Sequence, residues 1–173
     1  LDCCWRAGDS RSDYVGDAMS SLTILGLLPL IGSLALFLLP KDRELLAKQV
    51  ALGVSTVVAL AGLLMATSFD RGEVGFQFVE KYSWIPAFGI NYGLGVDGMA
   101  LLLILLALIL TPIVILACWN EAEGGRWSVK TFFALLLILE TMMVGVFAAT
   151  DIFLFYLFFE AMLIPVYFLI GGY

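Results

Sequence analysis

The sequence predicts an all-α membrane protein, with about five transmembrane helices and a short β-hairpin on one membrane face. Hydrophobic residues make up 62% of the 173-residue chain and charged residues only 14%, and the mean hydropathy is +1.02. This composition lies well outside the range of soluble globular domains. Because lipid offers no partners to backbone N–H and C=O groups, long apolar runs in lipid must form helices that bond internally.

Five apolar runs have the length that a bilayer core requires, which is about 20 helical residues. The predicted helices are residues 22–39, 48–68, 98–119, 129–149 and 152–171. Asp97 and Ser128 directly precede the third and fourth runs, and their side chains are of the types that cap helix N-termini. Residues 1–18 are polar and precede Met19, which we interpret as the natural start. We therefore expect residues 1–18 to be a non-native extension, with a short solvated tail as the alternative, and residues 19–173 to be the membrane domain.

The connection from residue 69 to 96 is too long for a simple turn and contains many rings. Phe76 and Phe78 alternate with polar residues, and glycines follow at Gly89, Gly93 and Gly95. Aromatic side chains suit the headgroup zone of a membrane. We therefore predict a β-hairpin that lies on the outer membrane face.

The distribution of basic residues predicts the orientation. Lys41 and Arg43 lie between the first two helices, and Arg126 and Lys130 lie between the third and fourth. Short loops rich in Lys and Arg stay in the cytoplasm. The hairpin and the N-terminus are then outward, and a bacterial inner (plasma) membrane is the expected location.

The sequence lacks the residues that several classes of function require. The sequence has no histidine, and Cys3, Cys4 and Cys118 form no metal-ligand spacing. We therefore expect this chain to bind no haem, zinc or iron–sulfur cofactor. The net charge of −6 and the scattered Lys and Arg residues argue against nucleic acid as a partner.

Two carboxylates lie near the middle of predicted helices: Glu140 in the fourth and Glu160 in the fifth. Placing a carboxylate at that depth costs at least a few kcal/mol, so such a residue marks an ion pathway by default. Burial opposes ionisation, which allows the group to exchange protons near neutral pH. Each acid lies ten residues from Thr150, so an antiparallel pair of helices places both at one depth. The sequence does not determine whether they face each other.

Polar groups accompany Glu160 along its helix. At about 100° per residue, Tyr156 and Tyr167 fall within roughly 40° of Glu160 on the helical wheel. Pro165 lacks an N–H, so the carbonyl of Ala161 loses its intrahelical donor next to Glu160. An unpaired carbonyl beside an acid favours bound water. We predict a proton-translocation site at Glu160, supported by Tyr156, Pro165 and Tyr167.

The other acids have two interpretations each. Glu140 is either a partner of the proton site or an acid held in helix packing, because only Thr141 accompanies it. Glu121 and Glu123 follow Trp119 at the expected cytoplasmic end of the third helix. They are either ordinary solvated acids or part of a proton entrance.

Two stretches resemble subunit M of NADH:quinone oxidoreductase (respiratory complex I), the mitochondrial subunit-4 type of antiporter-like protein. They read Ile-Asn-Tyr-Gly-Leu-Gly-Val-Asp-Gly at residues 90–98, and Gly-Val-Phe-Ala-Ala-Thr-Asp at 145–151 followed by Phe-Phe-Glu-Ala-Met-Leu-Ile-Pro-Val-Tyr-Phe-Leu-Ile at 158–170. In that family the acid of the Phe-Phe-Glu-Ala-Met motif translocates protons, and this acid corresponds to Glu160. The family also has an acid near the end of the third helix, which matches either Glu121 or Glu123.

The resemblance implies a subunit of a large complex. Its expected partners are other membrane subunits of complex I, especially antiporter-like neighbours, together with protons and the lipid bilayer. NADH, FMN, iron–sulfur clusters and quinone are expected elsewhere in the complex, and quinone reduction there would drive proton movement here. Family members have about fourteen helices, so we expect this chain to be an N-terminal fragment that does not pump alone.

Two other functions compete with this one. A subunit of a multisubunit cation/proton antiporter would share the acid at Glu160 but would need no quinone chemistry. A membrane scaffold without transport would have no need for a midplane acid on a polar stripe.

Overall fold

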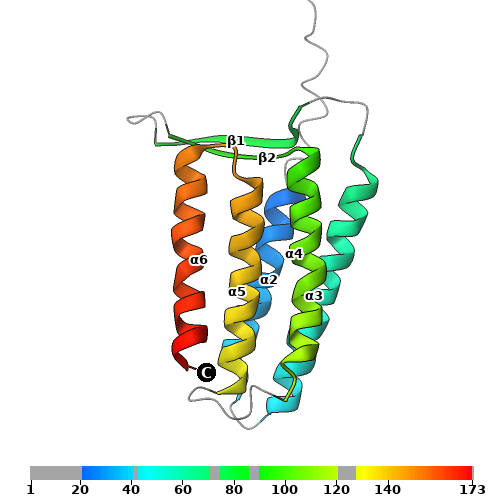
Figure 1. Ribbon diagram of the computed structural model, residues 1–173, viewed down its shortest axis with the longest axis vertical. Coiled ribbons are helices and arrows are strands. Elements are labelled where there is room, and N and C mark those ends of the chain that lie inside the picture. Colours follow the sequence, from blue (N-terminus) through cyan, green and yellow to red (C-terminus); the bar gives the residue numbers. More distant parts are fainter. Residues whose placement is uncertain (1–20, 41–42, 71–74, 86–89, 121–127, 173) are drawn as a thin grey trace, which may run out of the picture.

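The computed structural model describes residues 21–40, 43–70, 75–85, 90–120 and 128–172. Figure 1 shows a bundle of helices with a two-stranded hairpin across one end. The elements are α2 (Ser21–Leu38), α3 (Glu44–Thr67), β1 (Gln77–Ile85), β2 (Ile90–Val96), α4 (Gly98–Ala117), α5 (Val129–Ala148) and α6 (Ile152–Gly172). The polar segment 1–18 lies outside the described residues.

The helices have the length and the apolar composition of membrane-spanning segments. Within the described ranges, α3, α4, α5 and α6 are long and apolar enough to cross a membrane, and α2 is a shorter apolar helix. The predicted fold class, a helical membrane protein with a small hairpin, is confirmed. The second helix begins at Glu44, earlier than the predicted start at Lys48. A carboxylate in the first turn favours this earlier start because it complements the positive end of the helix dipole.

The hairpin forms where it was predicted. β1 and β2 pair antiparallel, with Gln77 opposite Val96 and Tyr82 opposite Tyr92. The Thr150 N–H donates to the Gly93 carbonyl at 2.9 Å, which attaches the hairpin to the turn between α5 and α6. A Cβ on Gly93 would lie 2.6 Å from the Thr150 hydroxyl oxygen, so this close approach requires glycine.

Polar side chains fasten the ends of the helices. Asp97 caps α4 as predicted, because its carboxylate accepts a hydrogen bond from the Ala100 N–H at 2.7 Å. Ser128 occupies the predicted N-cap position of α5, where its hydroxyl hydrogen-bonds that of Thr131 at 2.9 Å. Lys130 donates to the carbonyl of Leu39 at 2.8 Å, beyond the end of α2. The first two contacts are local to one helix end each, and the Lys130 bond joins the start of α5 to the end of α2.

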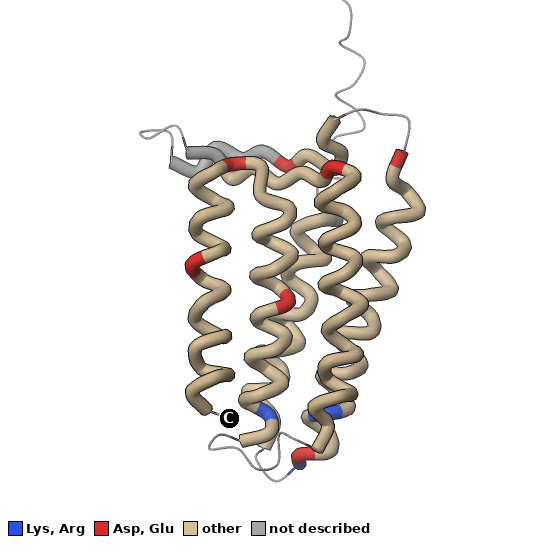
Figure 2. The backbone as a smooth tube through the Cα atoms, viewed as in Figure 1, with Lys and Arg blue, Asp and Glu red and all other residues tan. Residues whose placement is uncertain are grey.

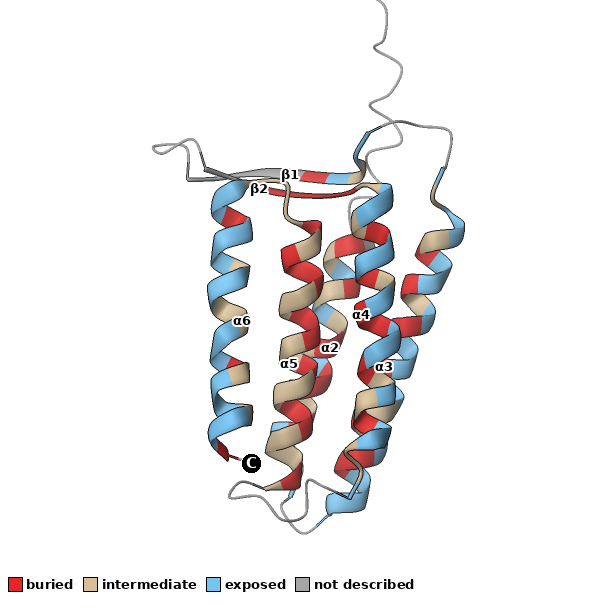
Figure 3. Cartoon of the chain, viewed as in Figure 1, coloured by how far each residue is buried: buried red, intermediate tan, exposed pale blue. Residues whose placement is uncertain are grey.

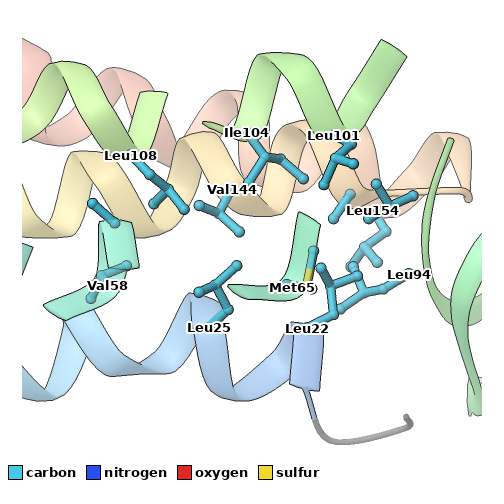
Figure 4. Packing of buried hydrophobic residues seen from close by; sticks show 13 residues of the cluster. Leu22, Leu25, Val58, Met65, Leu94, Leu101, Ile104, Leu108, Val144 and Leu154 are labelled. Carbon is cyan, nitrogen blue, oxygen red and sulfur yellow. The ribbon is translucent and has the colours of Figure 1, made fainter. Parts of the chain in front are cut away.

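The core consists of two apolar clusters, one above the other along the bundle. The cluster nearer the hairpin includes Leu25, Val58, Leu108 and Val144, which Figure 4 shows packed together. The other cluster includes Leu36, Ala51, Ile115, Phe133 and Leu137. We call them the hairpin-side cluster and the far cluster. Helices α2, α3, α4 and α5 contribute to both, and α5 packs against all the other helices.

Helix α6 packs mainly against α5 and leaves most of its surface exposed, as Figure 3 shows. The contact depends on Gly145, where a Cβ would lie 2.7 Å from the ring of Phe158. The absence of a side chain at Gly145 therefore lets the aromatic ring approach the α5 backbone.

We expect Gly145→Ala to lower the free energy of unfolding by about 1–3 kcal/mol, because the new methyl group displaces the Phe158 ring. Gly53→Ala is the matched control, since a Cβ at Gly53 meets nothing within 4 Å. It should raise the same quantity by up to about 1 kcal/mol through improved helix propensity. Unfolding in mixed detergent micelles, followed by circular dichroism, measures both. Equal effects of the two substitutions would contradict the close α5–α6 contact.

Candidate functional site

Glu160 lies on the ninth residue of α6, well inside a helix long enough to cross a membrane. Its side chain is exposed, on the surface of α6 that no described element covers. Figure 2 shows an acidic residue partway along α6, away from both ends of the helix. A mid-helix carboxylate on an open face is available to a partner or to water.

The predicted polar stripe is present on the exposed side of α6. Tyr156 and Tyr167 are both exposed, like Glu160, and the Tyr156 hydroxyl donates a hydrogen bond to the Glu160 carboxylate. Pro165 is buried instead and lies on a different side of the helix from these three residues. Tyr156 therefore offers the carboxylate one hydrogen-bond donor, and the other lone pairs of the carboxylate stay available.

Glu140 has the opposite surroundings. It is the twelfth residue of α5 and its side chain is 0% exposed. Neither of its carboxyl oxygens has a hydrogen-bond partner among the described residues. Thr141 does not supply one, because its hydroxyl donates to the Leu137 carbonyl at 3.2 Å. An unpaired buried acid is costly, and its neutral form costs less than its charged form.

Glu140 and Glu160 lie at similar depths but are not hydrogen-bonded to each other. Each is eight residues from the hairpin end of its helix, about 12 Å at 1.5 Å per residue. Because Glu140 is enclosed and unbonded while Glu160 is exposed and bonded to Tyr156, the two carboxylates do not share a hydrogen bond. The structure therefore provides two separate environments for the two acids.

The remaining predicted residues, Glu121 and Glu123, lie outside the described residues. Within the described ranges there is no group of three or more His, Cys, Asp or Glu side chains that could hold a metal ion.

Two buried charged residues were not singled out by the sequence. Lys48 of α3 is 1% exposed, and its ammonium lies 5.7 Å from the centre of the Trp119 ring. Glu80 of β1 is 0% exposed and accepts hydrogen bonds from the Thr23 N–H at 3.3 Å and from the Thr23 hydroxyl. The alternation around Phe76 and Phe78 could have indicated that alternate hairpin residues face the bundle.

Glu140 and Glu80 offer a direct comparison, because both are fully buried but only Glu80 is hydrogen-bonded. We expect Glu140→Leu to raise the free energy of unfolding by about 1–3 kcal/mol, since it removes an unsatisfied polar group. Glu80→Leu should lower it by about 1–3 kcal/mol, because the Thr23 hydroxyl loses its acceptor. Detergent unfolding measures both changes. If Glu140→Leu lowers the free energy of unfolding as much as Glu80→Leu does, Glu140 stabilises the packing of the helices and is not an unsatisfied group.

Comparison with known proteins identifies clear relatives. Subunit M of NADH-quinone oxidoreductase from Mycobacterium tuberculosis is 40% identical over 88% of this chain and 32% of that protein. Chain 4 of the NADH-ubiquinone oxidoreductase of Arabidopsis thaliana is 38% identical over 87% of this chain and 30% of that protein. Subunit M from Rhodobacter capsulatus is 40% identical, with shares of 87% and 29%.

No family model matches the chain. The chain spans about a third of the length of these curated relatives. The resemblance predicted from residues 90–98, 145–151 and 158–170 is confirmed. This membrane chain is homologous, over nearly nine-tenths of its length, to a part of the subunit M and chain 4 proteins of NADH-quinone oxidoreductases.

Proposed function

We propose that this chain forms part of a proton-translocating membrane subunit of an NADH:quinone oxidoreductase, with Glu160 as the proton-exchanging carboxylate. The observation that carries the proposal is the position of Glu160, a carboxylate inside a helix of membrane-crossing length. A carboxylate at that depth is expensive in lipid and is retained where ions or protons pass. The names of the relatives supply the class of complex.

The chemistry at Glu160 is the uptake and release of a proton. The ionised carboxylate can accept a hydrogen bond from Tyr156, one turn earlier in α6. Protonation turns one carboxyl oxygen into a donor, so the group can pass its proton to a water or to a partner on the open face of α6. A cationic partner from the rest of the subunit would favour the ionised form, and its approach or withdrawal would drive release or uptake.

Glu140 and the acids Glu121 and Glu123 belong to the same proposal. Glu140 holds a proton inside the bundle, and one of Glu121 and Glu123, which follow α4 in the sequence, collects protons for the pathway. Tyr167 extends the polar face of α6, and Pro165 frees the Ala161 carbonyl as an acceptor for water. Together they would carry protons between a water-exposed end and the middle of the membrane.

The redox steps would take place on other subunits. In this proposal NADH, FMN, the iron–sulfur clusters and quinone are bound elsewhere in the complex, and antiporter-like membrane subunits are the neighbours of this chain. The open face of α6 is where the rest of the subunit or a neighbour would pack. Electron transfer would then act on Glu160 through conformational or electrostatic coupling.

The proposed orientation follows the charges. Arg43, Lys48 and Lys130 lie toward the end of the bundle opposite the hairpin, whereas Asp97 and Asp151 lie at the hairpin end. Under the positive-inside rule the hairpin faces outward and the basic end faces the cytoplasm of a bacterium.

The competing antiporter function is not favoured by the relatives, which are named as quinone oxidoreductase subunits. Dependence of proton movement on Na⁺ would be its signature.

The direct test is Glu160→Gln in the full-length subunit of the assembled complex. We expect NADH-driven proton movement through this subunit to fall about a hundredfold, because glutamine cannot exchange a proton. Proton uptake by inverted membrane vesicles, recorded with a pH-sensitive dye, gives the readout.

The control for this test is Glu44→Gln, which neutralises an exposed acid at the first turn of α3. It should leave proton movement unchanged. Wild-type proton movement in Glu160→Gln, in a complex that assembles normally, would contradict the proposal.

A further inference from the structure

The interior of the bundle contains a polar layer that separates the two apolar clusters. Each of the four helices that build the clusters contributes one buried polar residue to it: Ser33 from α2, Ser55 from α3, Thr111 from α4 and Glu140 from α5. All four side chains are at most 7% exposed. We call these four residues the polar layer.

The order of residues along each helix places the polar layer between the clusters. In α3, Ser55 lies between Ala51 of the far cluster and Val58 of the hairpin-side cluster. In α5, Glu140 lies between Leu137 and Val144 in the same way. In each of these two helices the three residues are three or four positions apart, so all three lie on one face of the helix.

The same order holds in the other two helices. Thr111 of α4 lies between Leu108 of the hairpin-side cluster and Ile115 of the far cluster. Ser33 of α2 lies between Leu25 and Leu36. Four helices thus change from apolar to polar and back to apolar at corresponding positions.

Contacts at glycines show that these positions lie at similar depths. Gly32, next to Ser33, approaches Val54, next to Ser55, so closely that a Cβ would lie 2.6 Å from a Val54 methyl group. Gly26 of α2 faces Val144 of α5, so counting along these antiparallel helices brings Glu140 level with residue 30, about one turn from Ser33.

A glycine contact also gives the position of Thr111 along the bundle axis. Gly62 of α3 approaches Leu108 of α4, where a Cβ would lie 2.4 Å from a Leu108 methyl group. Thr111 is therefore about one turn from Ser55 along the bundle axis.

The hydrogen bonds within the polar layer leave acceptors open. The hydroxyls of Ser33, Ser55 and Thr111 donate to carbonyls of their own helices, at 2.9, 3.1 and 3.0 Å. A hydroxyl that donates once still has lone pairs to accept a bond. Neither carboxyl oxygen of Glu140 has a partner among the described residues. The layer therefore combines one proton-carrying group with three groups that can accept hydrogen bonds.

Few other ionisable groups are present around the layer. Helices α2 and α4 contain no charged or titratable side chain between their ends. Helix α3 has Glu44 and Lys48 near its start, at least seven residues before Ser55. Helix α6 has Tyr156, Glu160 and Tyr167 on its exposed side. Apart from Glu160 on the exposed side of α6, these helices therefore place no titratable side chain at the depth of Glu140.

The bundle also has space beside this region. A cavity of about 160 Å³ lies between α2, α5, α6 and β2, and its lining includes Leu30 and Thr141. Its lining is mostly apolar and includes none of the four polar-layer residues, so it provides space beside the layer and not a passage through it. It reaches from the hairpin end to the depth of Glu140.

We propose that the polar layer is a second proton-binding site, in which Glu140 holds a proton and exchanges it through water bonded to the hydroxyls of Ser33, Ser55 and Thr111. A hydrated proton gives its H⁺ to one carboxylate oxygen, and the acid that forms donates its O–H to a water or hydroxyl oxygen. Release reverses the same step. This inference rests on the role proposed above for Glu140 and deepens it, but its test does not depend on transport through Glu160.

Infrared spectroscopy of the chain in lipid nanodiscs tests the layer directly. At neutral pH we expect a carboxylic-acid C=O band that is lost in Glu140→Gln and retained in Glu160→Gln. Transfer to D₂O should shift the band as the acid proton exchanges. In Ser55→Ala combined with Thr111→Val, the exchange should be about tenfold slower, because the bridging waters lose two partners.

Matched controls come from hydroxyls that point away from the core. Thr56 and Thr67 are exposed, and each donates to a carbonyl of its own helix, as the layer hydroxyls do. Thr56→Val combined with Thr67→Val should exchange at the wild-type rate. Circular dichroism confirms that each variant retains its helix content.

Three results would overturn the proposal. The first is the absence of a band that depends on Glu140, and the second is a band that does not exchange in D₂O. The third is a wild-type exchange rate in the double variant Ser55→Ala with Thr111→Val. This double variant retains Glu140, so it tests the proposal even if Glu140→Gln fails to fold. A loss of the band in Glu160→Gln alone would assign it to the other acid. Failure of transport in Glu160→Gln bears on the proposed function and leaves this test unaffected.

Discussion

The structure depends on one constraint, which is that a polypeptide in lipid must satisfy its own backbone hydrogen bonds. Helices do so locally, and this is why the apolar runs of the chain form α3 to α6 and the shorter α2. The two-stranded hairpin cannot satisfy its outer edges in the same way, and it lies across one end of the bundle instead. The division into a helical interior and a β cover follows from the same rule.

Polar side chains also need hydrogen-bond partners, and the three glutamates Glu80, Glu160 and Glu140 differ in whether they have them. Glu80 is buried and receives two hydrogen bonds from Thr23, so it stabilises the contact between hairpin and α2. Glu160 is exposed and has Tyr156 as its donor. Glu140 is enclosed with no donor among the described residues. A fold optimised for stability alone would replace such a group with a hydrophobic residue, so the retention of Glu140 favours a functional explanation.

The two apolar clusters give the polar layer its position. A continuous core of Leu, Ile and Val would exclude water along the whole bundle, whereas two clusters separated by Ser33, Ser55 and Thr111 confine the polar region to about two helical turns in the middle of the bundle. Packing is close on both sides, as the contacts at Gly32 and Gly62 show. The arrangement combines a rigid bundle with one hydrophilic level inside it.

Much of the fold could be predicted from the sequence because its signals are local. Apolar length indicates a membrane helix, Asp97 before an apolar run indicates a cap, and the rings of residues 76–92 indicate a hairpin. The depth of Glu140 and Glu160 followed from counting residues around the α5–α6 turn.

The directions in which Glu140 and Glu160 point were harder to predict from the sequence. They depend on how α5 packs against the other four described helices, and the fourth apolar run has no clear polar face that would reveal them. Burial of Lys48 was missed for a similar reason, since a lysine at the edge of an apolar run usually marks a loop. The polar layer became visible only when the serines and threonine of separate helices were brought to one depth.

Attachment of a membrane-impermeant maleimide to single cysteines tests the central claim, a bundle that spans the bilayer with these acids inside it. Ser68→Cys lies at the hairpin end of α3 and Asn120→Cys lies past the opposite end of α4, and Cys3, Cys4 and Cys118 are replaced by serine in both. If the helices cross the bilayer, the reagent labels the two positions from opposite sides of the membrane. Labelling of both positions from the same side would contradict the central claim, because α3 and α4 would then not carry the chain across.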